Sequence, residues 1–223
     1  MLRADEIRTN VSALEARIAA ACARAGRARA GVRLVAVTKT FPASDVDHAI
    51  AAGMIDVGEN KVQEARDKKP SVAGSARWHL IGHLQSNKAK DAVRLFDVIQ
   101  TIDSVELAER VARFAESEGK RQEVLVQVNV GEEEQKSGAE IADVPSLVRR
   151  VSALPSLHLS GLMAIPPFLE AEAMRPYFRR LRALRDDLGL PELSMGMTDD
   201  FEVAIEEGAT MIRVGRAIFG ARG

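Results

Sequence analysis

A lysine follows directly on an apolar run in the first fifth of the chain. The run reads VRLVAVTK, ends at Lys39, and predicts a strand. A lysine at such a strand end is partly desolvated, and desolvation lowers the pKa of an amine. A neutral amine can condense with a carbonyl compound to give a Schiff base. The same position also suits an ordinary lysine that reaches into solvent, so position alone leaves both interpretations open.

A second candidate lies near the C-terminus, where GRAIFG spans 215–220 after another apolar run. Gly215 lets the backbone approach a ligand closely, and the N–H groups that begin a short helix attract anions. Thr198 can add a hydroxyl from the preceding loop. Asp199 and Asp200 would repel a phosphate, which we therefore expect nearer Gly215. The alternative is a tight turn that binds nothing.

Asn60 begins the sequence NKVQ and fits two compatible roles. It can cap the following helix, with Gln63 reaching back as in a capping box, or it can contact a ligand.

Four acidic and histidine residues could be considered as metal ligands, namely Glu59, Glu64, His79 and His83. Their spacing matches no metal-binding motif, so we expect no metal. The chain also contains no Gly-x-Gly-x-x-Gly, no P-loop and no nucleophile elbow.

The elements that must position these residues alternate along the chain. Eight short apolar runs predict strands at 32–37, 55–57, 78–81, 98–102, 124–130, 157–163, 193–195 and 211–214. Helical patterns lie between them, for example at 44–52, 104–118, 171–188 and 199–207. This alternation predicts parallel strands, and eight such units predict an α/β fold, a closed (β/α)₈ TIM barrel. A doubly wound open sheet is the alternative.

An N-terminal helix is predicted before the first strand. Its apolar stripe consists of Ile7, Val11, Leu14, Ile18 and Cys22. Asp5 can cap its start and Gly26 can end it. We expect residues 1–26 to pack on the barrel and residues 1–223 to form one domain.

The composition limits the class of protein. The chain has 223 residues, 46% of them hydrophobic, a net charge of −1 and one cysteine. The near-neutral charge argues against a general nucleic-acid or membrane-surface binder. A single cysteine excludes an internal disulfide and favours a reducing compartment. No apolar run approaches the ~20 residues that span a bilayer. We expect a cytoplasmic protein.

Several long blocks, in order, resemble the pyridoxal phosphate homeostasis proteins: VAVTKTFP, DVGENKVQEARDK, WHLIGHLQSNK, GLMAIPP and LSMGMTDDFEVAIEEGATMIRVGRAIFGAR. The resemblance implies a barrel of the alanine racemase N-terminal type that carries pyridoxal 5'-phosphate as an aldimine on Lys39. It also implies that Thr198, Gly215 and the backbone of Arg216 hold the phosphate. Arg213 would face the pyridine nitrogen, and the pocket would be lined by Asn60, Met163 and Ser194. Relatives usually carry Ser where this chain has Thr198, which keeps the hydroxyl.

The resemblance further implies a role in vitamin B6 homeostasis without established turnover. The protein would be a monomer that binds the cofactor and passes it to apoenzymes. The alternative is a racemase-like enzyme, which needs a second base, a tyrosine from an additional domain. We expect no such domain, because the chain ends at Gly223, and the only tyrosine, Tyr177, lies in the predicted helix 171–188. A sugar-phosphate aldolase is a third, weaker reading. The charged loop 131–138, with Lys136, has no assigned role.

Overall fold

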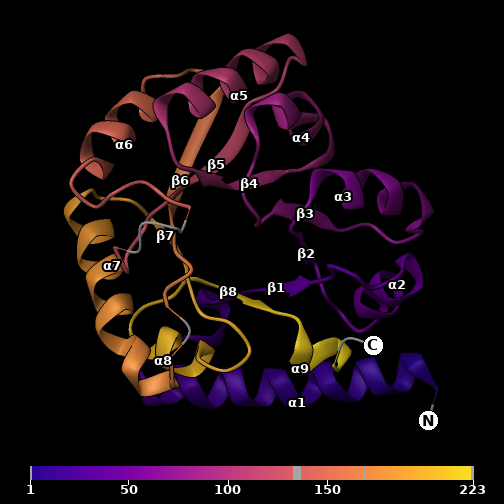
Figure 1. Cartoon of the computed structure of the whole chain (residues 1–223). Coiled ribbons are helices and arrows are strands. Elements are labelled where there is room, and N and C mark those ends of the chain that lie inside the picture. The colour runs from indigo at the N-terminus through magenta and orange to yellow at the C-terminus, as the bar shows by residue number, and fades with distance from the viewer. Residues whose placement is uncertain (1, 133–136, 168, 222–223) are drawn as a thin grey trace.

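The fold is a closed barrel of eight parallel strands (Figure 1). This computed structural model describes residues 2–132, 137–167 and 169–221. Adjacent strands pair in chain order, and β8 pairs with β1 to close the sheet. The strands are β1 (Arg33–Val37), β2 (Asp56–Glu59), β3 (Arg77–Leu80), β4 (Val98–Ile102), β5 (Gln122–Gln127), β6 (Leu157–Met163), β7 (Glu192–Ser194) and β8 (Met211–Val214). The predicted (β/α)₈ barrel is confirmed, and the doubly wound open sheet is wrong.

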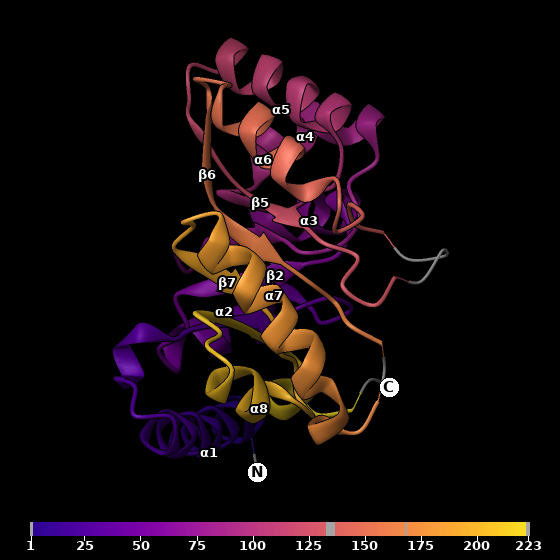
Figure 2. The same ribbon diagram turned by 90° about the vertical axis from the view of Figure 1, so that its left-hand side faces the viewer.

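Helices cover the outside of the barrel. They are α1 (Arg3–Arg24), α2 (Ala43–Ala51), α3 (Val62–Lys68), α4 (Ala89–Leu95), α5 (Val105–Ser117), α6 (Val144–Ser152), α7 (Arg175–Asp187), α8 (Phe201–Glu206) and α9 (Arg216–Phe219). Short 3₁₀ turns lie at Arg29–Gly31, Lys69–Ser71, Ser86–Lys88 and Ala171–Met174. Figure 2 shows α7 running along the side of the barrel. Among the described residues, no helix is long and apolar enough to cross a membrane.

Helix α1 completes the outer ring. The helix that follows β8, α9, has only four residues. The longer α1 packs against α2, α8 and α9 and so covers the junction of β8 with β1 (Figure 1). Its predicted apolar stripe is buried, as is Ala21. This helix therefore fills a position in the ring that the short α9 cannot.

The two predicted ends of α1 have different outcomes. Gly26 follows its last turn with φ of 64°, and Arg27 N–H donates to the Cys22 carbonyl at 2.9 Å, so the predicted stop is confirmed. The predicted Asp5 cap is wrong. The N-cap residue is Leu2, and Asp5 lies in the first turn, where its carboxylate suits the helix dipole.

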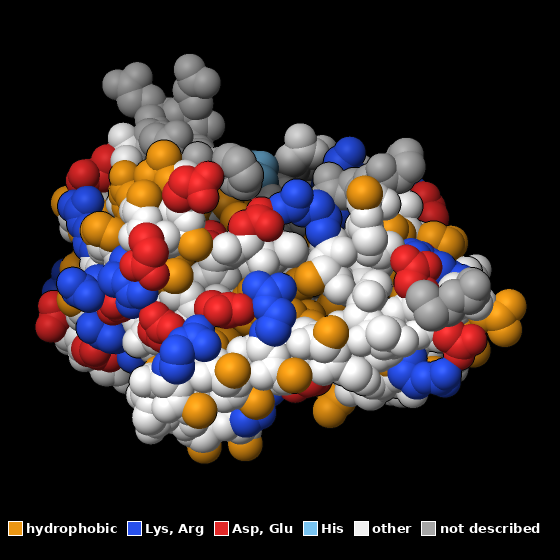
Figure 3. All heavy atoms as spheres, turned by 90° about the horizontal axis from the view of Figure 1, so that it is seen from below, with side chains coloured by type: hydrophobic (Ala, Val, Ile, Leu, Met, Phe, Trp, Pro, Cys, Tyr) orange, Lys and Arg blue, Asp and Glu red, His pale blue; other side chains and the backbone are white. Residues whose placement is uncertain are grey.

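Ion pairs join α1 to its neighbours across the face shown in Figure 3, where acidic and basic side chains lie side by side. Arg24 pairs with Glu202 at 3.1 Å and with Glu206 at 2.9 Å on α8. Glu206 also pairs with Arg175 of α7 at 2.9 Å. Such exposed pairs contribute little individually, and here they bridge three helices.

One strand and one helix have boundaries that differ from the predicted ones, each for an identifiable reason. The predicted strand 124–130 ends at Gln127, because the next residues bond to a later segment: Asn129 N–H donates to the Ala139 carbonyl at 2.9 Å. The predicted helix 171–188 is divided into a 3₁₀ turn and α7. Pro176 lies in the first turn of α7, the helical position that proline tolerates best.

Candidate functional site

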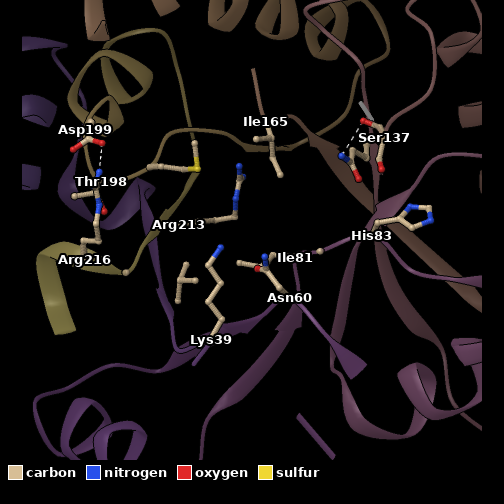
Figure 4. Close-up of a pocket in the computed structure, with 15 residues that line it drawn as sticks. Lys39, Asn60, Ile81, His83, Ser137, Ile165, Thr198, Asp199, Arg213 and Arg216 are labelled. Atoms are coloured by element: carbon tan, nitrogen blue, oxygen red, sulfur yellow. Dashed lines mark hydrogen bonds and ion pairs between the residues drawn. The ribbon is translucent and has the colours of Figure 1, made fainter. Parts of the chain in front are cut away.

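A cavity of about 520 Å³ opens at the carboxyl ends of the strands (Figure 4). Loops that follow most of the strands contribute to its wall. The described lining residues are Val37, Lys39, Asn60, Ile81, Gly82, His83, Gln127, Ser137, Ile165, Met197, Thr198, Asp199, Arg213, Gly215 and Arg216. The volume is typical of a small-molecule site, and this end of a barrel is where such sites lie.

Lys39 follows β1 by two residues and is half-buried. In Figure 4 its side chain extends into the cavity toward Arg213, with Asn60 beside it. The cavity therefore brings an amine, an amide and a guanidinium together at one end.

The backbone on both sides of Lys39 is held by α3. Lys68 Nζ donates to the Thr38 carbonyl at 2.7 Å. The N–H of Thr40 donates to the Glu64 carboxylate. Thr40 has φ of 70°, a left-handed conformation that is uncommon for a β-branched residue and is strained. Contacts from Lys68 and Glu64 therefore fix the strained turn that aims Lys39.

Lys68 is itself part of a buried charge cluster that sequence reasoning missed. Its Nζ lies 2.5 Å from Glu59 Oε1 and 3.1 Å from Glu64 Oε1. Glu59 is fully buried and also accepts a hydrogen bond from Thr38 Oγ1 at 2.6 Å. Burial raises the pKa of Glu59, while the Lys68 and Thr38 hydrogen bonds oppose that shift. Glu59 and Lys68 are nine residues apart, and no short motif links them.

We expect Lys68→Met to lower the free energy of unfolding by about 3 kcal/mol, because it leaves the Glu59 carboxylate buried without its cation. Denaturant unfolding measures the change. Lys90→Met, at an exposed position on α4, should stay within about 0.5 kcal/mol of the parent. The double variant Lys68→Met/Glu59→Gln should recover most of the loss. A Lys68→Met protein as stable as the Lys90 control would show that the pair contributes nothing.

Asn60 lines the cavity but does not cap α3. The helix starts at Val62, and its N-cap residue is Lys61, whose side chain makes no cap hydrogen bond. The predicted capping box is therefore wrong. Gly82 explains how Asn60 is positioned: a Cβ on Gly82 would lie 2.2 Å from the Asn60 carbonyl oxygen. Only glycine permits this contact. Gly82 is a site residue that sequence reasoning missed, although a glycine just past a strand end was the available signal.

The opposite wall of the cavity is formed by the loops that follow β7 and β8. Gly215 is the N-cap residue of α9, and Arg216 is its first residue, as the predicted short helix requires. The first N–H groups of a helix have no acceptor within it. A Cβ on Gly215 would lie 3.2 Å from the Val37 carbonyl oxygen, so glycine lets α9 pack against β1.

The loop that carries Thr198 is fixed from within. Gly196 has φ of 92°, and a Cβ there would meet the Ala204 Cβ at 2.5 Å. The buried Asp200 carboxylate accepts the Met197 N–H at 2.5 Å, and burial raises the pKa of Asp200. Asp199 pairs with the Arg216 guanidinium (Figure 4), which neutralises its charge at the cavity rim.

Arg213 is 3% exposed and occupies the base of the cavity. One terminal nitrogen donates to Ser194 Oγ at 2.7 Å and the other to the Ala164 carbonyl at 2.8 Å. Burial lowers the pKa of Arg213 to about 10, partly opposed by Asp200. The side chain is therefore a cation at neutral pH with a fixed orientation.

Two predicted lining residues lie elsewhere. Ser194 and Met163 are fully buried and are not among the residues that line the cavity. Ser194 lies beneath the cavity lining and accepts a hydrogen bond from Arg213. Met163 packs with Val98 and Leu125 inside the barrel. Six predicted residues do line the cavity: Lys39, Asn60, Thr198, Arg213, Gly215 and Arg216.

The four residues considered as metal ligands contact three charged partners, because Glu59 and Glu64 share Lys68. Glu59 binds Lys68, His79 contacts Asp56, and His83 lies 3.6 Å from Asp103. Across the described ranges, no group of three histidine, cysteine, aspartate or glutamate side chains could hold a metal ion.

One end of the 131–138 loop reaches the cavity. Ser137 lines it, and its carbonyl accepts a hydrogen bond from Gln127 Nε2 at 3.1 Å. Glu132, at the other end, pairs with Arg180 of α7 at 3.0 Å. Residues 133–136, and with them Lys136, lie outside the described residues.

Fold and cavity together define a TIM-barrel protein with a small-ligand site built around a lysine. The family described as alanine racemase, N-terminal domain, matches residues 9–223. A pyridoxal phosphate homeostasis protein of Pseudomonas aeruginosa is 46% identical over 220 residues, which cover 97% of this chain and 96% of that protein. One of Aquifex aeolicus is 43% identical, covering 92% and 94%. The chain belongs to the pyridoxal phosphate homeostasis proteins, within the alanine racemase N-terminal domain family.

Solved structures agree in fold. PipY of Synechococcus elongatus, in a structure with PLP bound, is 36% identical with a TM-score of 0.85, covering 96% of this chain and all of that one. An alanine racemase of Clostridium difficile has a TM-score of 0.73 at 14% identity, a likeness of fold alone. The alignment covers 98% of this chain and 57% of that racemase.

Proposed function

We propose that this protein binds pyridoxal 5'-phosphate in the cavity and holds it through a covalent bond to Lys39. The observation that carries the proposal is the placement of Lys39 and Arg213 in one cavity, with Thr198, Gly215 and Arg216 along its wall. These groups differ in chemistry, and each matches a different part of the cofactor.

The donor set fits the cofactor in three places. The amine of Lys39 suits its aldehyde. The Thr198 hydroxyl and the N–H groups of Arg216 and Ala217, the first residues of α9, suit its phosphate. Arg213, fixed by Ser194 and the Ala164 carbonyl, suits the edge of its ring that bears the nitrogen. The cavity volume of about 520 Å³ accommodates a molecule of this size.

The covalent step consumes no reactant beyond the lysine and the aldehyde. The neutral amine of Lys39 adds to the aldehyde carbon, and water then leaves, so that a C=N bond joins the two. Addition of water reverses the step and releases the cofactor. Reversibility suits a protein that holds and passes on the cofactor, and the relatives are named for pyridoxal phosphate homeostasis.

The described lining of the cavity provides few of the proton-transfer groups that catalysis with this cofactor requires. When bound, the cofactor supplies an electron sink, but turnover also needs positioned proton-transfer groups. Arg213 keeps its proton at neutral pH, so it leaves the ring nitrogen unprotonated and the sink weak. Among the described lining residues, the acid–base groups other than Lys39 and the arginines are His83 and Asp199. Asp199 is paired with Arg216, and Tyr177 lies on α7, outside the cavity lining.

We expect the apoprotein to take up one pyridoxal phosphate per chain and to turn over no amino acid. The loaded protein is incubated with L-alanine and other L-amino acids, and D-isomers, amines and keto acids are assayed. The control is Lys39→Ala. Turnover on the order of 1 s⁻¹, the ordinary enzyme range, that disappears in Lys39→Ala would identify an enzyme instead of a carrier.

A further inference from the structure

Five buried polar side chains form an unbroken line of hydrogen bonds through the inside of the barrel. They come from β8, β7, β4, β3 and β2 and are, in order, Arg213, Ser194, Gln100, His79 and Asp56. The successive distances are 2.7, 2.6, 2.9 and 2.7 Å. None of the five is more than 6% exposed. This buried chain begins at the cavity and ends at Asp56, the first residue of β2, at the other end of the barrel.

Every bond in the buried chain points the same way. Arg213 can only donate, so Ser194 accepts from it and must direct its own proton elsewhere. That proton goes to Gln100 Oε1. Gln100 Nε2 therefore donates one proton to His79 Nδ1. Its second proton points to Met211 Sδ, which lies 3.0 Å from Nε2. His79 Nδ1 must accept, which leaves its proton on Nε2 for the Asp56 carboxylate.

The protonation state of His79 agrees with this direction of the hydrogen bonds. Burial lowers the pKa of His79, although Asp56 opposes the shift, so the ring is neutral at pH 7. A protonated ring would put an N–H on Nδ1 against the Gln100 amide. At the far end, the Arg33 guanidinium lies 4.0 Å from the Asp56 carboxylate and 3.7 Å from the Glu192 carboxylate.

We infer that Gln100 and His79 are positioning residues for Arg213: the buried chain holds the guanidinium in one orientation at the base of the cavity. Between a cation that can only donate and a carboxylate that can only accept, the hydrogen bonds of the line can all form in one direction only. A buried polar group left without its partner is penalised, so Ser194 cannot turn away from Arg213 without breaking the line. The inference rests on the proposed function, because it assigns Arg213 to the ring of pyridoxal phosphate.

The test compares three variants. Gln100→Met fills a similar volume but breaks the line at its centre. His79→Gln can still accept from Gln100 and donate to Asp56. Val98→Ala removes packing from the barrel interior, where the Val98 side chain packs with Leu125 and Met163. Pyridoxal phosphate affinity and the denaturation midpoint are measured for each.

We expect Gln100→Met to bind pyridoxal phosphate about ten-fold more weakly, the effect of one weakened bond to a charged group. His79→Gln should stay within about two-fold of the parent, and Val98→Ala should lose stability while keeping affinity. Parental affinity in Gln100→Met, or an equal loss in His79→Gln and Gln100→Met, would overturn the inference.

A second measurement needs neither a variant nor the cofactor. ¹⁵N NMR of the wild-type apoprotein should show His79 neutral with its proton on Nε2. A proton on Nδ1 would reverse the bond between His79 and Gln100 and overturn the inference. If the wild type fails to bind pyridoxal phosphate, the proposed function fails, and this spectrum still decides whether the directed chain exists.

Discussion

Replacing Lys39 with alanine is expected to abolish the covalent bond to pyridoxal phosphate and the visible absorbance that accompanies it. The phosphate and ring contacts would remain, so some cofactor should still bind. We expect affinity to fall by at least about 100-fold, or about 2.7 kcal/mol, because the bond that Lys39 forms is lost entirely. The barrel should stay folded, since Lys39 is half-buried at the cavity and lies outside β1. Equilibrium titration and an absorbance spectrum measure both effects.

Lys39→Arg is the matched control, because arginine keeps the charge and length but cannot condense with an aldehyde at neutral pH. Both variants should lose the visible band, and both should unfold at parental denaturant concentrations. A band of parental intensity in Lys39→Ala would mean that another lysine carries the cofactor.

The second large effect is expected at the wall formed by Thr198 and Gly215. Thr198→Ala removes one hydroxyl donor to a charged phosphate, a loss of ~1.5–3 kcal/mol or roughly ten- to a hundred-fold in affinity. Gly215→Val should weaken binding at least as much. Its Cβ would crowd the Val37 carbonyl oxygen at 3.2 Å and push the start of α9, with its N–H groups, away from β1.

Matched controls separate these effects from a general loss of structure. Thr198→Ser keeps the hydroxyl and should bind nearly as the parent does. Gly31→Ala adds a methyl where a Cβ meets nothing within 4 Å, far from the cavity lining, and should change neither affinity nor stability beyond about 0.5 kcal/mol. If Thr198→Ala and Gly215→Val both bind with parental affinity, the phosphate is held elsewhere.

Much of the site could be predicted because a barrel imposes a simple rule. Residues just past the carboxyl ends of its strands meet at one face. Lys39, Thr198 and Gly215 lie one to four residues past the ends of their strands, so their place in the cavity follows from the alternation of apolar runs and helices. The count of eight and the parallel pairing that intervening helices enforce favoured a closed order of strands over an open sheet.

The wrong predictions concern residues at the ends of helices and strands, where a shift of one or two residues changes what a side chain contacts. Asn60 is not a cap because α3 starts at Val62, one residue later than a cap at Asn60 requires. Ser194 and Met163 end β7 and β6, yet both are fully buried away from the cavity lining. Both side chains point into the barrel, below the cavity lining, and an apolar run does not reveal how deep in the barrel its last residue lies.

The buried chain could not be predicted from the sequence. Its bonds join residues 19 to 94 positions apart, such as Gln100 with Ser194, and no local pattern specifies such pairs. His79 gives a signal in isolation, as a histidine within an apolar run, but its partners depend on how the barrel closes. The same holds for Lys68 and Glu59, which look like ordinary surface charges until α3 folds back on β2.

Locating the reduced cofactor on the wild-type chain tests whether Lys39 carries it. The loaded protein is treated with borohydride, digested with trypsin and analysed by mass spectrometry. We predict one adduct per chain on Lys39, which also blocks cleavage there and yields a single modified peptide spanning 34–61. An adduct on any other lysine, or no adduct on a protein saturated with pyridoxal phosphate, would contradict the assignment of Lys39 as the attachment site.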